Sequence, residues 1–170
     1  MKKLIIGMAA STLFLVACNN KAAVNTTGND SVALYLKKIK QEALSADSAY
    51  AKKDISALFK DCASGFIDYG NGDSKPITNM DTLKAISKSF FEAFPDFKGE
   101  NLQAVAEDST VIVTGEWSGT FKKAFMKMKP TNGVYKTFDA DIFTFNKAGK
   151  ITSHKSTYRL ATVTITFPNI

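Results

Sequence analysis

The chain has 170 residues, a length suited to a single domain, with a formal net charge of +6 at pH 7 and 45% hydrophobic residues. Its lysines are scattered rather than clustered, so the composition argues against a nucleic acid as a partner. One histidine and two cysteines supply no cluster of metal ligands, and we expect neither a metal nor another cofactor.

Residues 1–17 have the pattern of a secretory signal peptide. A cationic Met-Lys-Lys start precedes an apolar run that is too short to span a bilayer. The run ends in Leu-Val-Ala-Cys, which resembles the lipobox of bacterial lipoproteins, and this implies that Cys18 carries palmitate-type acyl chains and becomes the first mature residue. Asn19 is not the acidic residue linked to inner-membrane retention, so we expect a cell-envelope protein on the outer membrane that faces the periplasm. An ordinary signal peptide is the alternative.

Residues 18–30 are expected to be the lipidated cysteine and a flexible tether, because this segment is small and polar and has no hydrophobic period. The folded domain is then expected over 31–170. Once Cys18 carries lipid, Cys62 is alone and no intramolecular disulfide can form. We interpret Cys62 as a small buried apolar residue.

Three helices are predicted in the first half of the domain. Residues 31–53 form an amphipathic pattern, in which apolar side chains recur at alternating spacings of three and four. A shorter helix is expected around 55–60. A third helix, over about 80–94, has Asn79 or Asp81 as its cap.

The hydrophobic period changes from 3.6 to 2 in the second half of the domain, which predicts strands. After a first short strand near Asp68, the predicted strands cover residues 101–108, 109–121, 135–145 and 151–167. Helices followed by such strands indicate an α+β fold, with three N-terminal helices packed on a strongly curved antiparallel sheet. A pocket is expected at the open end of that sheet.

Several segments resemble the SnoaL-like polyketide cyclase family of the nuclear transport factor 2-like superfamily. The segment AFPDFKGENLQAVAEDSTVIVTGEWSGT is similar to the family's helix ending in Phe-Pro-Asp, its next strand, and its tryptophan before a Gly-Thr pair. KPTNGVYK and DIFTFNKAGKI resemble the loop and the penultimate strand that follow. The resemblance covers about 54–160. It implies a cone-shaped α+β barrel with a deep pocket, in a protein that is often a homodimer.

Some functional positions of the family carry different residues here. Members often have a histidine directly after the Gly-Thr pair, where this chain has Phe121. In the last strand, His154 falls on the family histidine, and Arg159 falls on the aspartate that serves as acid/base. Because an arginine effectively never loses its proton, it cannot shuttle one near neutral pH. The pattern therefore favours a pocket without the usual acid/base residues.

The numbering of the last strand predicts which side chains face the pocket. Ile151 and three later apolar residues have odd numbers, so the odd face is expected to be the packed one. Lys155 and Arg159 would then point to the concave side, where they would bind an anionic ligand, and His154 would point outward. A β-bulge in this strand would reverse these assignments.

Further candidates for the pocket lie on other strands. Asp141 shares a strand face with Asp139, and the two could form an acid/base pair, contact Arg159 across the hairpin, or be solvated carboxylates. Asp68 lies near the first strand, where several enzymes of the superfamily keep an acid. Trp117 and Phe121 are candidates for ligand contact, although a tryptophan on an apolar strand face is more often part of the core.

The sequence is consistent with three functions. The first is a membrane-anchored pocket protein that binds a small anionic organic ligand through Arg159 and Lys155. The second is a cyclase, isomerase or hydratase with Asp68 or Asp141 as its base, and with His154 as a further catalytic candidate. The third is a structural lipoprotein whose cavity is filled by its own side chains.

Overall fold

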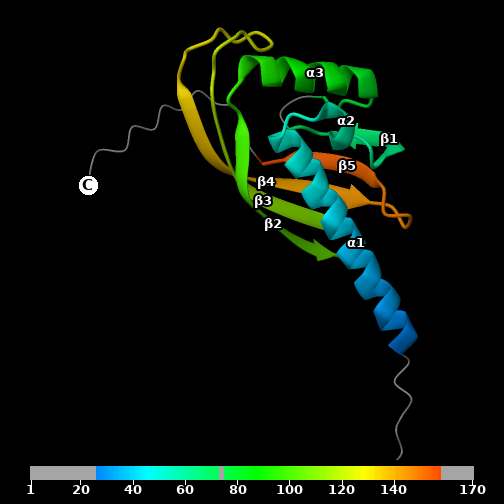
Figure 1. Ribbon diagram of the computed structural model, residues 1–170. Helices are drawn as coiled ribbons and strands as arrows, with labels where there is room; N and C mark the ends of the chain where they lie inside the picture. Colours follow the sequence, from blue (N-terminus) through cyan, green and yellow to red (C-terminus); the bar gives the residue numbers. More distant parts are fainter. Residues whose placement is uncertain (1–25, 73–74, 158–170) are drawn as a thin grey trace, which may run out of the picture.

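The computed structural model describes residues 26–72 and 75–157 as an α+β fold with helices on one face of a sheet (Figure 1). The elements follow in the order α1 (Thr26–Ala51), α2 (Ile55–Leu58), β1 (Cys62–Asp68), α3 (Met80–Ala93), β2 (Lys98–Glu107), β3 (Thr110–Thr120), β4 (Val134–Phe145) and β5 (Ile151–Ser156). None of the helices in the described part of the chain is long and apolar enough to cross a membrane. The predicted signal peptide and most of the predicted last strand lie outside the described residues.

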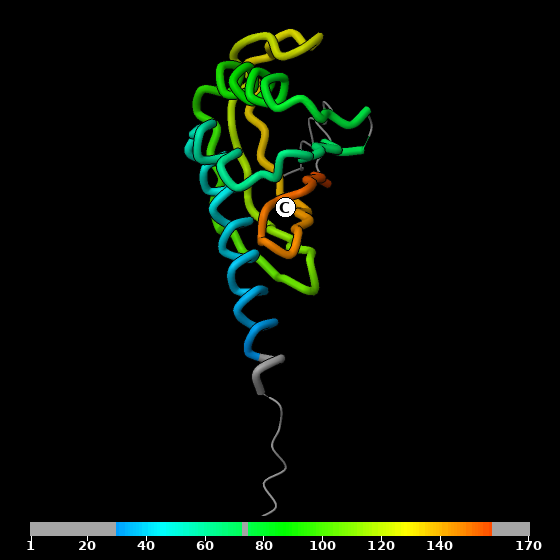
Figure 2. Tube along the Cα trace, turned by 90° about the vertical axis from the view of Figure 1, so that its right-hand side faces the viewer, coloured from blue at the N-terminus to red at the C-terminus, as the bar shows by residue number. Residues whose placement is uncertain are grey.

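The first helix, α1, begins at Thr26 rather than at residue 31, so the end of the predicted tether is helical. Its buried residues Ile39, Ala43 and Ala46 recur at spacings of four and three, and they belong to the hydrophobic core that joins α1 to the sheet. The N-terminal turns of α1 project beyond the rest of the fold (Figures 1 and 2).

Helix α3 begins where the sequence predicted. The side chain of Asn79 accepts a hydrogen bond of 2.8 Å from the backbone N–H of Thr82, which makes Asn79 the N-cap. The helix ends at Ala93, before Phe94, because the following Pro95 disfavours helical geometry in the residue that precedes it.

Two of the segments that resemble the family bind each other. Asp96, in the Phe-Pro-Asp segment after α3, accepts hydrogen bonds from the backbone N–H and the hydroxyl of Thr120, at 2.7 and 2.5 Å. Thr120 belongs to the Gly-Thr pair that ends β3. This contact joins the segment after α3 to the end of β3.

The five strands have the order β1-β5-β4-β3-β2. Strands β2 to β5 pair with antiparallel neighbours, but β1 runs parallel to β5, so the prediction of a purely antiparallel sheet was wrong. The antiparallel pairs β2–β3 and β4–β5 follow from short connections, whereas no turn sets the relative direction of two strands as far apart in the chain as β1 and β5. The sheet is open, with β1 and β2 at its edges, and its strong curvature and cone shape stay predictions.

Strand β5 contains a β-bulge near its start. Thr144 of β4 is opposite Ser153, but the next residue, Phe145, is opposite Ile151, so β5 has one extra residue, Thr152. The hydroxyl of Thr152 donates a hydrogen bond of 3.0 Å to the backbone carbonyl of Thr144. The extra residue shifts the alternation of side chains by one position, and the assignment of faces by odd and even numbers was therefore wrong.

The buried side chains form two hydrophobic clusters between the helices and the sheet. One lies under α1 and includes Ile39, Phe66, Val111, Phe143 and Ile151. The other lies under α3 and includes Phe91, Phe94, Phe97, Trp117 and Phe125. Because every aromatic side chain of the second cluster is at most 8% exposed, this end of the fold is mainly an aromatic core.

Candidate functional site

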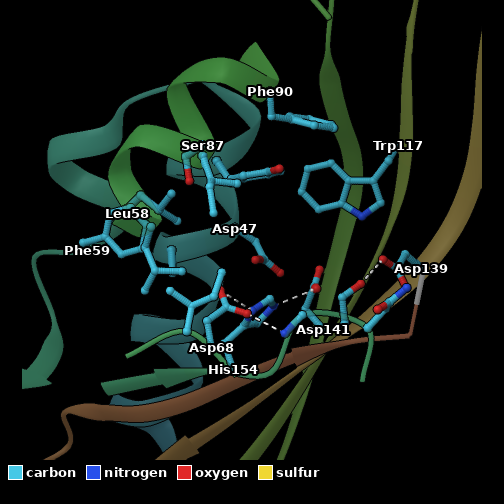
Figure 3. A pocket seen from close by; sticks show the side chains of 18 of the residues that line it. Asp47, Leu58, Phe59, Asp68, Ser87, Phe90, Trp117, Asp139, Asp141 and His154 are labelled. Atoms are coloured by element: carbon cyan, nitrogen blue, oxygen red, sulfur yellow. Dashed lines mark hydrogen bonds and ion pairs between the residues drawn. The ribbon is translucent and has the colours of Figure 1, made fainter. Parts of the chain in front are cut away.

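A cavity of about 420 Å³ lies between the helices and the inner face of the sheet (Figure 3). Helices α1 and α3 supply one side of it, and strands β1, β3, β4 and β5 supply the other. Most of its lining is apolar, and its ionisable acid and imidazole groups gather at one end: Asp47, Asp68, Asp139, Asp141 and His154. An apolar cavity with a few convergent polar groups is typical of a small-molecule site.

Aromatic rings form the opposite end of the cavity. The ring of Trp117 stacks on Phe97, with centroids 5.4 Å apart and planes 11° apart. Tyr50 meets both rings edge-on, at centroid distances of 5.2 Å to Phe97 and 5.9 Å to Trp117. Phe90 stacks on Tyr50 at 5.8 Å. These rings hold one another in place, and Trp117 is therefore both a core residue and part of the cavity wall.

His154 lies between two carboxylates at the polar end of the cavity. Its Nε2 is 3.0 Å from Oδ1 of Asp141, on β4, and its Nδ1 is 3.4 Å from Oδ2 of Asp68, at the end of β1. Asp68 also accepts a hydrogen bond of 2.6 Å from the backbone N–H of Gly70. The parallel pairing of β1 with β5 places Asp68 opposite His154, and the bulge in β5 turns the imidazole inward.

The charges of this cluster follow from its contacts. Burial alone lowers the pKa of the His154 imidazole, but the hydrogen bonds and charges of Asp141 and Asp68 outweigh burial and raise this pKa well above its usual range. Burial acts to raise the pKa of Asp68, but His154 and the N–H of Gly70 lower it overall. At neutral pH the cluster therefore holds an imidazolium against an ionised carboxylate.

Asp47 is a buried acid that sequence reasoning missed. It lies on α1, is 5% exposed, and its Oδ2 atom is buried without a hydrogen-bond partner among the described residues. Burial raises the pKa of Asp47 well above its usual range, and the charges of Asp141 and Asp139 add to this rise against the opposite effect of His154. A signal was present in the sequence, since Asp47 follows Ala43 by four residues and lies on the apolar stripe of α1.

Asp139 and Asp141 are buried, at 7% and 9% exposure, so the interpretation of both as solvated carboxylates was wrong. Asp139 accepts hydrogen bonds from the hydroxyl of Ser156 at 2.7 Å, from the hydroxyl of Thr157 at 2.5 Å, and from the backbone N–H of Ala140 at 2.7 Å. Asp139 is thus held by neutral donors, whereas Asp141 is held by His154.

Of the remaining residues that the sequence suggested for the pocket and that the structure describes, none is found to line the cavity except His154. Lys155 is exposed and does not line the cavity, so its predicted inward orientation was wrong. The β-bulge at Thr152 is the cause, because it reverses the faces of the residues that follow it. The predicted outward orientation of His154 was wrong for the same reason. Phe121 stacks on Phe94 with ring centroids 5.0 Å apart, and it is not among the lining residues. Arg159 lies outside the described residues.

Cys62 lies at the start of β1 and is a free, partly buried thiol that borders the cavity. Burial and the charges of Asp61 and Asp68 raise its pKa to about 12, so the thiol stays protonated and unreactive near neutral pH. Within the described residues, no group of three or more His, Cys, Asp and Glu side chains is arranged to hold a metal ion.

The geometry agrees with the family to which the sequence is similar. A sequence model described as SnoaL-like polyketide cyclase matches residues 41–164, and the chain belongs to this family. No curated protein matches the chain at a significant level.

Solved structures share the fold at low sequence identity. A protein of Xanthomonas campestris pv. campestris, assigned as a polyketide cyclase, has a TM-score of 0.66 and 12% identity, over 74% of this chain and 93% of its own. AclR of Streptomyces galilaeus has a TM-score of 0.59 and 21% identity, over 71% and 88%. A Catenulispora acidiphila protein with a ketosteroid isomerase-like fold, in complex with trimethylamine, has a TM-score of 0.58 and 13% identity, over 70% and 85%.

Proposed function

We propose that the protein is an acid/base enzyme of the cyclase, isomerase or hydratase kind, which moves a proton on a small neutral organic molecule. The observation that carries this proposal is the imidazole of His154, held between the carboxylates of Asp141 and Asp68 at the polar end of an apolar cavity. Carboxylates and an imidazole that converge in an apolar cavity are a common arrangement for the transfer of a proton to or from a substrate. In this proposal, the acid/base reaction is carried out by residues other than the one at position 159.

In this proposal Asp141 is the base. Its carboxylate takes a proton from a carbon next to a substrate carbonyl, the electron pair of the broken C–H bond forms a C=C bond, and the carbonyl π pair moves to oxygen. Asp141, now a carboxylic acid, returns the proton to another atom of the substrate. His154 stays an imidazolium that orients Asp141, and Asp68 holds the other ring nitrogen, so both are positioning residues.

The charge of the cavity favours a neutral substrate over the anionic ligand expected from the sequence. Its described lining contains four carboxyl groups and one histidine, and it contains no lysine or arginine. The anionic ligand was expected to bind Lys155 and Arg159, but Lys155 is exposed. The third function that the sequence suggested was a structural protein whose cavity is filled by its own side chains. A cavity of about 420 Å³ argues against this function.

Hydrogen–deuterium exchange tests this function without knowledge of the natural substrate. 2-Tetralone is a neutral bicyclic ketone with acidic protons next to its carbonyl, and NMR in D2O follows their replacement by deuterium. We expect the protein to accelerate this exchange, and Asp141→Asn to reduce the acceleration by about 100-fold or more, as for the loss of a general base. Lys155→Ala is the matched control on the neighbouring strand, and it should exchange at the wild-type rate.

Two results would overturn the proposal. If exchange stays at the buffer rate with the wild-type protein while 2-tetralone binds in the cavity, the protein is a binding module. If Asp141→Asn exchanges as fast as the wild type, Asp141 is not the base.

We further propose a cellular location and a state of assembly for the protein. Lipidation of Cys18 would place the domain at the outer membrane, on the periplasmic side, and the sequence pattern Leu-Val-Ala-Cys supports this. A homodimer and a strongly curved sheet are what the family resemblance implies. Exposed apolar side chains on the face of the sheet away from the helices, such as Phe138 at 69% and Val105 at 67%, are compatible with a dimer.

A further inference from the structure

We propose that Asp47 is a substrate-binding residue, whose carboxylic acid O–H donates a hydrogen bond to a carbonyl oxygen of the ligand in the cavity. The substrate class is then a neutral organic molecule with a carbonyl group. This inference rests on the proposed function and deepens it, because it names the atom that the site recognises on the substrate.

The position of Asp47 carries the inference. Asp47 lines the cavity from α1, across from the strands that hold Asp141 and His154 (Figure 3). Its side chain is almost fully buried, and Oδ2 has no hydrogen-bond partner in the described part of the protein. A buried polar atom without a partner costs about 1–3 kcal/mol, so such an atom in a cavity wall points to a ligand that completes it.

The surroundings of Asp47 decide its protonation state. His154, the one described cation-forming group in the cavity lining, bonds Asp141 and Asp68 through its two ring nitrogens. Burial of the Asp47 carboxyl group disfavours its charged form, and the nearby charges of Asp141 and Asp139 add to this effect. The charge of His154 acts in the opposite direction but does not outweigh them. The raised pKa of Asp47 agrees with this geometry, and a protonated carboxyl group has an O–H donor.

A donor at this place fits the proton transfer proposed above. When Asp141 removes the proton, negative charge develops on the carbonyl oxygen, and a donor that is already oriented stabilises that charge. Asp47 and Asp141 come from opposite walls of the cavity, so a flat substrate between them can meet the donor at its oxygen and the base at its neighbouring carbon. A protonated acid in an apolar site is suited to this role because it donates a hydrogen bond without bringing a charge.

Two variants and two probes test the inference at equilibrium. 2-Tetralone carries the carbonyl oxygen, and tetralin is the same bicyclic skeleton without it. Asp47→Asn keeps a donor at this position, whereas Asp47→Leu removes it with a side chain of the same branching and number of heavy atoms. Asp30→Asn is the control, because Asp30 is an exposed carboxylate on the same helix.

We expect the infrared carbonyl stretch of bound, ¹³C-labelled 2-tetralone to move to lower wavenumber in the wild type and in the Asp30→Asn variant. The shift should be smaller in Asp47→Asn and absent in Asp47→Leu. The preference for 2-tetralone over tetralin, measured as a ratio of dissociation constants, should fall by about three- to tenfold in Asp47→Leu, as expected for one neutral hydrogen bond.

The inference is overturned if Asp47→Leu keeps both the carbonyl shift and the preference for 2-tetralone. It is also overturned if the ammonium form of 2-aminotetralin binds more tightly than 2-tetralone and loses this advantage in Asp47→Leu, since Asp47 would then be an ionised partner for a cation. Failure of the proposed function is distinguishable, because Asp141→Asn should stop exchange of 2-tetralone but leave its carbonyl shift in place.

Discussion

Nε2 of His154 and Oδ1 of Asp141 are 3.0 Å apart, although the two residues are not directly opposite each other in the sheet. His154 is opposite Phe143, and Asp141 is the next residue along β4 on the same inner face. The contact is therefore diagonal, and it depends on the bulge at Thr152 that turns His154 inward.

Removal of the imidazole should destabilise the fold through this contact. In the His154→Ala variant, Asp141 and Asp68 lose a shared cation, and their side chains are only 12% and 21% exposed. We expect a loss of about 3 kcal/mol in the free energy of unfolding at neutral pH, since one partner of a buried pair is removed. Lys155→Ala, at the exposed neighbouring position, should unfold like the wild type in urea. A His154→Ala variant of wild-type stability would contradict the imidazolium assignment.

Asp47 should reduce stability at neutral pH. Its pKa is raised in the folded state, so the folded protein binds more protons than the unfolded chain at pH values above the unfolded pKa of about 3.9, and stability falls as the pH rises through this window. The Asp47→Asn variant has no titratable group at this position, so this loss of stability with rising pH is absent. We therefore expect the variant to melt at a higher temperature than the wild type at pH 7, and this difference to vanish near pH 3.5. A variant that is less stable at pH 7 would show that Asp47 is ionised and paired.

The aromatic end of the cavity depends on a glycine. Gly99 of β2 lies opposite Trp117 of β3, and a Cβ atom at this position would overlap the indole ring. Gly99→Ala should cost about 1–3 kcal/mol of unfolding free energy, as expected for overpacking, and it should weaken binding of 2-tetralone. Gly65→Ala is the matched control, because a Cβ there has no atom within 4 Å outside its immediate neighbours. Equal stability of the two variants would mean that the indole moves aside freely.

Lipidation of Cys18 stays a prediction that fractionation can test. We expect the wild-type protein to enter the detergent phase at its mature size after expression in a bacterium, since a diacylated terminus binds membranes firmly. The Cys18→Ser variant should accumulate as unprocessed or soluble material. If this variant still enters the detergent phase at the mature size, the anchor is elsewhere.

Local sequence patterns predicted the helices and strands, because the hydrophobic period of each element is visible within a short segment of the sequence. The alternation of Val111, Val113 and Trp117 gave the inner face of β3 correctly, and all three are at most 5% exposed. The N-cap residue Asn79 could also be predicted, because a helix cap depends only on residues that are close in the sequence.

The site was harder to predict, because it depends on contacts between distant parts of the chain. One extra residue, Thr152, reversed the faces of His154 and Lys155, and a period-2 pattern does not reveal where a bulge occurs. The parallel position of β1, which brings Asp68 to the site, involves no turn that the sequence could signal. Asp47 was overlooked because a single acid in a long helix is usually exposed.

The most direct test of this account is an NMR titration of His154. The chain has one histidine, so ¹⁵N-histidine labelling of a protein without a histidine tag gives a single pair of ring resonances. We expect both ring nitrogens to be protonated at pH 7, with a pKa above the usual value of about 6.5, and we expect this pKa to fall in both Asp141→Asn and Asp68→Asn. A neutral imidazole at pH 7 in the wild type, or a pKa that neither variant changes, would contradict the assignment of the Asp68–His154–Asp141 cluster as the acid/base centre.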